Sequence, residues 1–189
     1  SEGALIQATL VCNFEERDYI SKGRLVDRFG IVERIRQQPD TTYYPLVTNQ
    51  KIQEMMRSHD VLIFPTLDES LGWVAVEASL AGMPVISTDV YALPEIVIHG
   101  VTGYLIRLNK AQDSSRWSGL WLEGGEFDRE VACAFESMKT DLSSYLMNFF
   151  VNPQLSSEMG QAAREHVSSM YSFELASAKL KNIYKNALG

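Results

Sequence analysis

The sequence has few cysteines, no long apolar run and no excess of basic residues. Its two cysteines, Cys12 and Cys133, stand far apart without metal-type spacing, which predicts ordinary thiols in a reducing compartment. No segment approaches the roughly 18 apolar residues of a membrane span. Acidic residues outnumber basic ones by 24 to 17, and this balance argues against a general nucleic-acid binder. We therefore expect a cytoplasmic protein that binds no nucleic acid.

The composition is that of a folded protein. The chain has 189 residues, of which 46% are hydrophobic and 22% charged, so one domain with a sizeable core is expected. The first residues, Ser1 to Gly3, lack the basic and apolar regions of a signal peptide. Because no methionine begins the sequence, we expect a fragment of a longer protein or the remnant of a tag.

The first third of the chain predicts two strands and two helices. Strands are expected at Ala8–Phe14 and at Thr41–Val47, where Pro45 turns the far half into a loop. Apolar residues recur at helical spacing within Glu15–Gln38. A second helix should be capped by Thr48 or Asn49 and run through Ser58, with Ile52, Met55 and Met56 as its apolar stripe.

The middle of the chain predicts a βαβ unit. Val61–Phe64 is a continuous apolar run, typical of a parallel strand buried on both faces. Leu71–Ala81 has the pattern of a helix that ends at Gly82, and Pro84–Thr88 is a second short apolar strand. Two strands joined through a helix imply a parallel pair with a right-handed crossover. The fold class is therefore α/β, with a mainly parallel sheet.

The remainder predicts a third strand and a helical C-terminal part. A short helix is expected at Pro94–Ile98 and a strand at Tyr104–Ile106. Residues 107–130 lack a clear period and suggest an irregular insertion, whose Trp117 and Trp121 either pack on the domain, which we favour, or meet a partner. Helices should fill residues 131–189, over the segments Glu130–Phe150, Ser156–Tyr171 and Phe173–Leu188.

The candidate ligand site lies where the first two middle strands end. Ligands of open α/β sheets bind beyond the carboxyl ends of the strands, and the loops leaving Phe64 and Thr88 both emerge there. The start of a helix offers unpaired N–H groups to an anion, and Gly72 would let a ligand approach the backbone. The amides of Gly72, Trp73 and Val74 are thus candidate phosphate donors. The alternative is an ordinary helix start with Ser70 as its N-cap.

Two glutamates accompany this helix. Glu77 lies about two turns into a helix that is apolar nearly all round, and burying its charge without a partner would cost several kcal/mol. It could accept both hydroxyls of a ribose, or it could lie on a narrow solvent strip. Glu69 could reach the far side of the same ligand, or it could stabilise the helix dipole. The spacing of these residues in the sequence does not distinguish between the two roles of either glutamate.

Several blocks in register resemble the group 1 retaining glycosyltransferases. The segment Phe64–Ala78 (FPTLDESLGWVAVEA) resembles the Glu-x7-Glu motif of that family. The blocks Ala81–Asp89, Leu93–Val97 and Gly100–Leu105 follow in the family's order and spacing, and the final helix with Ile183 and Tyr184 is similar to its C-terminal tail. The clear match covers roughly residues 41–106. One departure is Tyr91-Ala92, where the family often has two glycines.

The resemblance implies a Rossmann-like three-layer domain, the C-terminal donor-binding half of a GT-B architecture over residues 1–189, without the N-terminal acceptor domain. It implies that Glu77 binds the donor ribose and that Glu69 is the catalytic residue beside the transferred sugar. The loop and helix start, here Ser70, Leu71, Gly72, Trp73 and Val74, would hold the sugar and diphosphate. Main chain near Tyr44 and Leu46 would border the base. The family's basic pair for the diphosphate cannot be placed.

The resemblance also implies a reaction. A full enzyme would transfer a sugar from a nucleotide diphosphate sugar to an acceptor glycan or glycolipid with retention, in polysaccharide, lipopolysaccharide or glycoconjugate synthesis. We expect no metal, because no Asp-x-Asp pair stands near the site, and no cofactor. Peripheral association of a full-length enzyme with the inner face of a membrane stays open. So do two other functions, a GT-B sugar-nucleotide epimerase and a non-catalytic sugar-nucleotide-binding module.

Overall fold

The structure is a computed structural model that describes residues 7–11, 37–44, 47–112 and 114–188. The chain divides into two compact units, Ser1–Ile52 and Gln53–Gly189.

The first unit contains a pair of parallel strands. Strand β1 (Ala8–Val11) pairs with β2 (Thr41–Tyr44) in the register Ala8↔Thr41 to Val11↔Tyr44. Both expected strands are confirmed over these residues. The helix expected within Glu15–Gln38 lies outside the described residues, except for the two glutamines at its end, which lie in a turn.

Helix α4 (Asn49–Ser58) begins in the first unit and ends in the second. The backbone N–H of Lys51 donates to Oγ1 of Thr48 at 3.3 Å, so Thr48 caps the helix as expected. Met56 is its buried residue, while Ile52 and Met55 are half-buried. The predicted helix and its apolar stripe are therefore both confirmed.

The second unit is an α/β domain with a parallel three-stranded sheet of β3 (Leu62–Phe64), β4 (Val85–Thr88) and β5 (Gly103–Ile106), in the order β3-β4-β5. The register runs Leu62↔Val85 between β3 and β4, and Val85↔Gly103 between β4 and β5. The helices that follow α4 are, in chain order, α5 (Trp73–Ala81), α6 (Leu93–Ile96), α7 (Gly124–Val151), α8 (Gln154–Met170) and α9 (Phe173–Leu188). The predicted βαβ unit is therefore confirmed.

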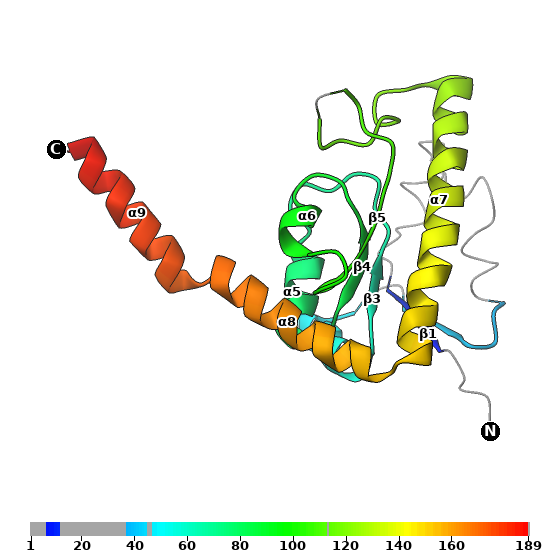
Figure 1. Cartoon of the computed structure of the whole chain (residues 1–189), viewed down its shortest axis with the longest axis horizontal. Helices are drawn as coiled ribbons and strands as arrows, with labels where there is room; N and C mark the ends of the chain where they lie inside the picture. Colours follow the sequence, from blue (N-terminus) through cyan, green and yellow to red (C-terminus); the bar gives the residue numbers. More distant parts are fainter. Residues whose placement is uncertain (1–6, 12–36, 45–46, 113, 189) are drawn as a thin grey trace. The chain divides into compact units, whose positions relative to one another are not determined.

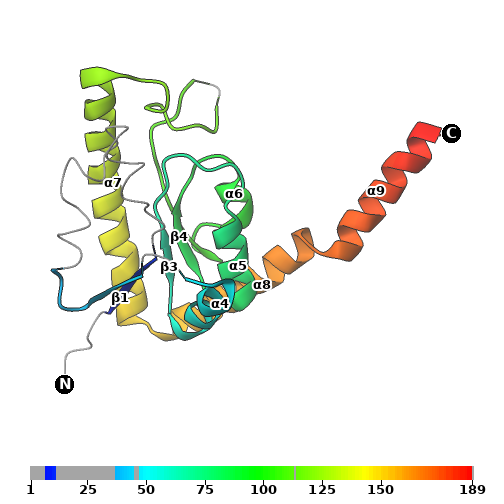
Figure 2. The ribbon, with the colours of Figure 1, turned by 180° about the vertical axis from the view of Figure 1, so that it is seen from behind.

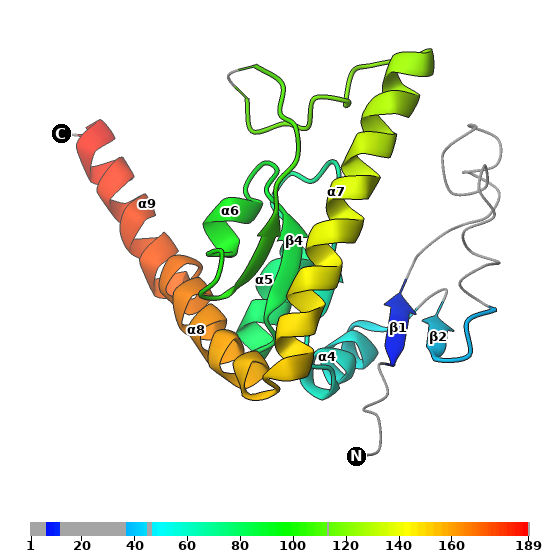
Figure 3. The same cartoon turned by 45° about the vertical axis from the view of Figure 1, so that its right-hand side comes forward.

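The sheet of the second unit lies between two helical layers. Figures 1 and 2, seen from opposite sides, place the strands between α7 and the pair α5 and α6. Helix α8 packs against α5 and α6, and α7 packs against β5 (Figure 3). The side chains of Val85, Ile86 and Ile106 are fully buried between these layers. A three-layer arrangement with a parallel sheet is what the sequence predicts.

Three local expectations differ from the structure. Ile63 in β3 is 41% exposed, so this strand is not buried on both faces; β3 pairs only with β4 among the described strands, as an edge of its sheet. Helix α5 begins at Trp73 rather than Leu71, because Gly72 has a left-handed backbone with φ of +83°. Helix α7 begins at Gly124, six residues before the expected start at Glu130.

Helices α5 and α8 meet at two glycines. A Cβ atom added to Gly160 of α8 would collide with the backbone carbonyl of Gly82, which ends α5. Gly160 therefore allows the closest approach between the two helices. This contact fixes the end of α5 that lies away from the candidate site.

Substituting Gly160→Ala should lower the free energy of unfolding by about 2 kcal/mol, because the backbones must separate to admit the methyl group. Gly125→Ala is the matched control, since a Cβ at Gly125 meets nothing within 4 Å. That variant should be unchanged or up to about 0.5 kcal/mol more stable. Urea unfolding followed by circular dichroism measures both, and equal stabilities for the two variants would contradict the close contact.

Candidate functional site

Two buried hydroxyls hold together the loops that leave β3 and β4. Ser87 and Thr88, at the end of β4, are both fully buried. The Ser87 hydroxyl donates to the carbonyl of Phe64 at 2.9 Å, and the Thr88 hydroxyl donates to the carbonyl of Thr66 at 2.5 Å. Both acceptors lie at or beyond the end of β3. The backbone of the first loop is therefore fixed relative to β4 at the carboxyl edge of the sheet, where α/β proteins bind ligands.

The loop before α5 reaches the helix through a left-handed glycine. Gly72 is buried and occupies the N-cap position, and no side chain caps the helix. A Cβ added to Gly72 would lie 2.7 Å from Cδ2 of Leu93 on α6, so this loop packs directly on α6. Ser70 is exposed and precedes the helix by three residues. The alternative in which Ser70 is the N-cap is therefore wrong.

The start of α5 keeps free backbone donors. Within the described part of the chain, the N–H groups of Trp73 and Val74 have no recorded acceptor, whereas those of Ala75 and Val76 donate to the carbonyl of Gly72. Unpaired amides at a helix start attract anions. The geometry is thus compatible with the expected role of these amides, and Val74 itself is half-buried.

The two glutamates of the motif differ in exposure. Glu77 is exposed one turn after Trp73, whose side chain is 63% exposed, and both stand on the side of α5 that its buried residues leave open. Glu69 is half-buried in the loop, with its Cγ 3.7 Å from the position of a Cβ on Gly72. Glu77 thus occupies the solvent strip that the sequence left open as an alternative. A ligand at the helix start remains within reach of that strip.

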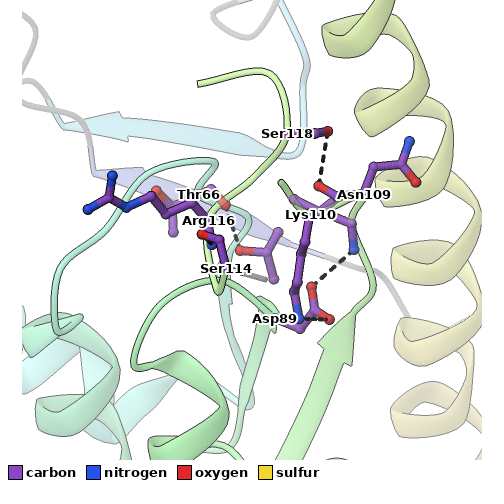
Figure 4. A network of polar contacts seen from close by, with 9 residues as sticks. Thr66, Asp89, Asn109, Lys110, Ser114, Arg116 and Ser118 are labelled. Atoms are coloured by element: carbon purple, nitrogen blue, oxygen red, sulfur yellow. Dashed lines mark hydrogen bonds and ion pairs between the residues drawn. The ribbon is translucent and has the colours of Figure 1, made fainter. Parts of the chain in front are cut away.

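Residues 107–112 and 114–123 belong to an excursion at the same edge of the sheet, called the excursion of residues 107–123 (Figures 1 and 3). Asp89 anchors it, because its Oδ1 accepts the N–H of Leu108 at 3.0 Å and its Oδ2 pairs with Nζ of Lys110 at 2.7 Å (Figure 4). Lys110 and Trp117 form an antiparallel bridge. Asp89 therefore holds this excursion in place.

The two tryptophans of the excursion behave differently. Trp117 is 3% exposed and lies edge-on to Phe127, with ring centroids 6.0 Å apart. Trp121 is 75% exposed. The expectation that both pack on the domain is therefore correct for Trp117 and wrong for Trp121. Residues up to Glu123 are irregular apart from the bridge, in line with the predicted insertion.

Tyr91 connects the loop after β4 to Ser115 in the excursion and to Asp68 in the loop before α5. Its backbone is left-handed with φ of +50°, and its N–H donates to the carbonyl of Ser115 at 2.9 Å. Loss of solvent around the ring raises the pKa of the Tyr91 hydroxyl, a hydrogen bond to the Asp68 carboxylate raises it further, and the charge of Arg116 lowers it. The hydroxyl therefore stays protonated and can donate to Asp68. The sequence marked Tyr91 as a departure from a glycine pair but missed this role.

Two further residues that the resemblance assigns to the site, Tyr44 and Leu46, belong to the first unit. Tyr44 ends β2 in the first unit, and Leu46 lies outside the described residues. His59, His99 and His166 each hydrogen-bond to a backbone group. Over the described ranges, no group of three or more potential metal ligands is present. None of the described helices is both long and apolar enough to cross a membrane.

Comparison with known families gives one match that spans more than half of the chain. The profile of glycosyl transferases group 1 matches residues 32–134. A Klebsiella pneumoniae protein known only as an uncharacterized 41.2 kDa protein in the cps region is 36% identical over 107 residues, covering 54% of this chain and 30% of that protein. D-inositol 3-phosphate glycosyltransferase of Streptomyces avermitilis is 27% identical over 165 residues, covering 87% of this chain and 28% of the relative.

Solved structures with a similar fold include a sucrose-phosphate synthase and a protein in complex with UDP-glucose. Sucrose-phosphate synthase from Thermosynechococcus elongatus aligns with a TM-score of 0.63 and 21% identity, over 96% of this chain and 38% of that structure. The Anabaena protein HepE in complex with UDP-glucose aligns with a TM-score of 0.62 and 18% identity, over 95% of this chain and 41% of that structure. The chain thus has the fold of one part of a GT-B protein and spans less than a third of the curated relatives named above.

The left-handed turn at the start of α5 generates a stability prediction. Gly72→Ala should lower the free energy of unfolding by about 3 kcal/mol, because the methyl group meets Leu93 in addition to the strained backbone. Gly82→Ala isolates the strain, since Gly82 has φ of +84° and nothing within 4 Å of an added Cβ. It should lose about 1 kcal/mol. Chemical unfolding of both variants measures the difference, and equal losses would refute the packing of this loop on α6.

Proposed function

The chain belongs to the glycosyl transferases group 1 family, and on that premise we propose that it carries the donor-binding site of a GT-B glycosyltransferase. The observation that carries the proposal is the arrangement around α5. A half-buried glutamate, a left-handed glycine, two free amides and an exposed glutamate follow one another at the carboxyl edge of the sheet. The proposed donor is a nucleotide diphosphate sugar, in keeping with the UDP-glucose bound to the Anabaena protein HepE.

We assign the ribose to Glu77. Its carboxylate is exposed on α5, and an acidic side chain that accepts two vicinal hydroxyls is a common way to hold a ribose. The N–H groups of Trp73 and Val74 would face the diphosphate, together with the backbone of Ser70, Leu71 and Gly72. We propose that both compact units belong to the donor-binding part of the enzyme.

Glu69 is proposed as the catalytic residue. It lies in the loop beside Gly72, where it would contact the transferred sugar and orient it. In the reaction, the bond from the anomeric carbon to the phosphate oxygen breaks and a bond to the acceptor oxygen forms, while the acceptor proton passes to the leaving phosphate. The helix-start amides would stabilise the negative charge that develops on that phosphate. The anomeric configuration would be retained.

The rest of a full-length enzyme would supply the acceptor. The chain covers 30% of the Klebsiella relative from a cps region and 28% of the Streptomyces relative, so an acceptor-binding domain would lie outside it. We propose a glycan or glycolipid acceptor in polysaccharide, lipopolysaccharide or glycoconjugate synthesis, on the cytoplasmic side of the membrane. Two alternative functions involve the same nucleotide sugar. An epimerase would convert it without an acceptor, and a non-catalytic module would bind it without catalysing a reaction.

The donor site is tested by calorimetric titration of this chain with UDP, GDP and ADP. One of the three should bind, and Glu77→Gln should weaken that binding about tenfold or more, because the ribose hydroxyls lose a charged acceptor. Glu158→Gln is the matched control, an exposed glutamate on α8. It should leave the affinity unchanged. Failure of the chain to bind any of the three nucleotides would refute the donor site.

Catalysis is tested in the full-length protein with Glu69→Gln. Turnover should fall by about a hundredfold or more, since an interaction made in the transition state is lost, while the affinity for the nucleoside diphosphate stays within about twofold. Product analysis with and without an acceptor separates transfer from epimerisation. Full activity of Glu69→Gln would remove Glu69 from the chemistry, and a wild-type protein that binds nucleotide but forms no product would favour a binding module.

A further inference from the structure

The excursion after β5 holds an arginine at the edge of the proposed donor site. Arg116 lies between Ser115, whose carbonyl accepts the N–H of Tyr91 at 2.9 Å, and the buried Trp117. Its own N–H donates to the hydroxyl of Ser114 at 2.9 Å, and its carbonyl accepts the N–H of Ala111 at 3.0 Å. The backbone of Arg116 is therefore fixed on both sides, which places its side chain on an anchored turn.

The turn itself is tied to the sheet. The Asp89 carboxylate holds Leu108 and Lys110 at one end, and the N–H of Ser118 donates to the carbonyl of Asn109 at 2.9 Å. These contacts connect the excursion to the residue that follows β4. The position of Arg116 thus depends on the same edge of the sheet that carries the loop before α5.

The Arg116 side chain faces that loop. Figure 4 shows it extending away from the Asp89–Lys110 pair, on the side where Thr66 begins the loop toward α5. The Tyr91 hydroxyl hydrogen-bonds to the Asp68 carboxylate, and the charge of Arg116 acts on the pKa of the same hydroxyl, so both charged groups influence Tyr91 from different loops. Asp68 directly precedes Glu69. Arg116 therefore lies close to the loop that we assign to the transferred sugar and the diphosphate.

A negatively charged ligand at this edge of the sheet would need a positively charged side chain that is not already paired with a carboxylate. Lys110 is paired with Asp89 at 2.7 Å, and its charge is therefore largely neutralised. Arg116 is exposed, and among the described residues no carboxylate forms an ion pair with it within 4.0 Å. A guanidinium can offer two parallel N–H donors to a phosphate, which makes arginine suited to this task.

We propose that Arg116 binds the diphosphate of the donor from the side opposite the start of α5, so that the excursion of residues 107–123 forms a wall of the donor site. This assignment rests on the proposed function. It gives the diphosphate two partners from distant parts of the sequence, the amides of Trp73 and Val74 and the guanidinium of Arg116. It also gives the excursion a role that its irregular sequence does not indicate.

The test compares Arg116→Gln with the wild-type chain in calorimetric titrations with UDP, GDP and ADP and with the corresponding monophosphates. For the diphosphate that binds, affinity should fall about tenfold or more, because a charge-assisted contact is lost. The monophosphate of the same base should lose less, and the salt dependence of diphosphate binding should become weaker. Arg116→Lys should retain part of the affinity, since it keeps the charge without the planar fork.

The matched control is Arg57→Gln, which removes the same charge from an exposed position in the last turn of α4, before β3 begins. Its diphosphate affinity should equal that of the wild type. Equal affinities for Arg116→Gln and the wild type would overturn the assignment of Arg116 and leave the donor site intact. Equal losses in Arg116→Gln and Arg57→Gln would also overturn it, because the effect would then be one of net charge. A wild-type chain that binds none of the nucleotides would refute the donor site itself, and the role of Arg116 with it.

Discussion

The site depends on two hydroxyl groups that are buried at the end of one strand. Ser87 and Thr88 are fully buried and donate to carbonyls of Phe64 and Thr66, across the end of the sheet. Because a buried hydroxyl needs a partner, these side chains fix the separation of the two loops as firmly as another pair of ladder hydrogen bonds would. The loop that begins at Thr66 then reaches Gly72 and α5 from a defined starting point. The strand that pairs at the centre of the sheet thus organises both sides of the proposed ligand site.

A second set of contacts joins this edge to a distant part of the chain. Asp89 continues directly from β4 and holds Leu108 and Lys110, which follow β5. Parallel strands bring their carboxyl ends to one edge, so the three segments that leave β3, β4 and β5 meet there. The neighbouring loops are bound to each other by side chains rather than by regular structure. The sheet thus supports loops that are joined to one another by side-chain contacts such as those of Asp89.

The fold could be predicted largely from local patterns, and the site only in part. Helix α9 has the predicted bounds, and the cap at Thr48 and the βαβ unit follow from turn residues and hydrophobic periodicity. The start of α5 was displaced by the left-handed φ of Gly72, which spacing does not reveal. Trp117 and Trp121 have similar surroundings in the sequence but opposite exposure, because burial is decided by distant packing. Contacts such as that of Tyr91 with Ser115 join residues without a shared period, and no local pattern identifies them.

Tyr91 has a backbone conformation that residues with a side chain disfavour. A left-handed φ of +50° costs a tyrosine about 1 kcal/mol, which a glycine would avoid. A mutation to glycine would therefore relax the main chain and at the same time remove the hydroxyl that reaches Asp68. Relief of the backbone strain would raise the free energy of unfolding, and loss of the hydrogen bond to Asp68 would lower it, so the two effects oppose each other. In directed evolution for thermal tolerance, glycine at this position would relax the backbone and leave the Asp68 carboxylate without the hydroxyl that donates to it.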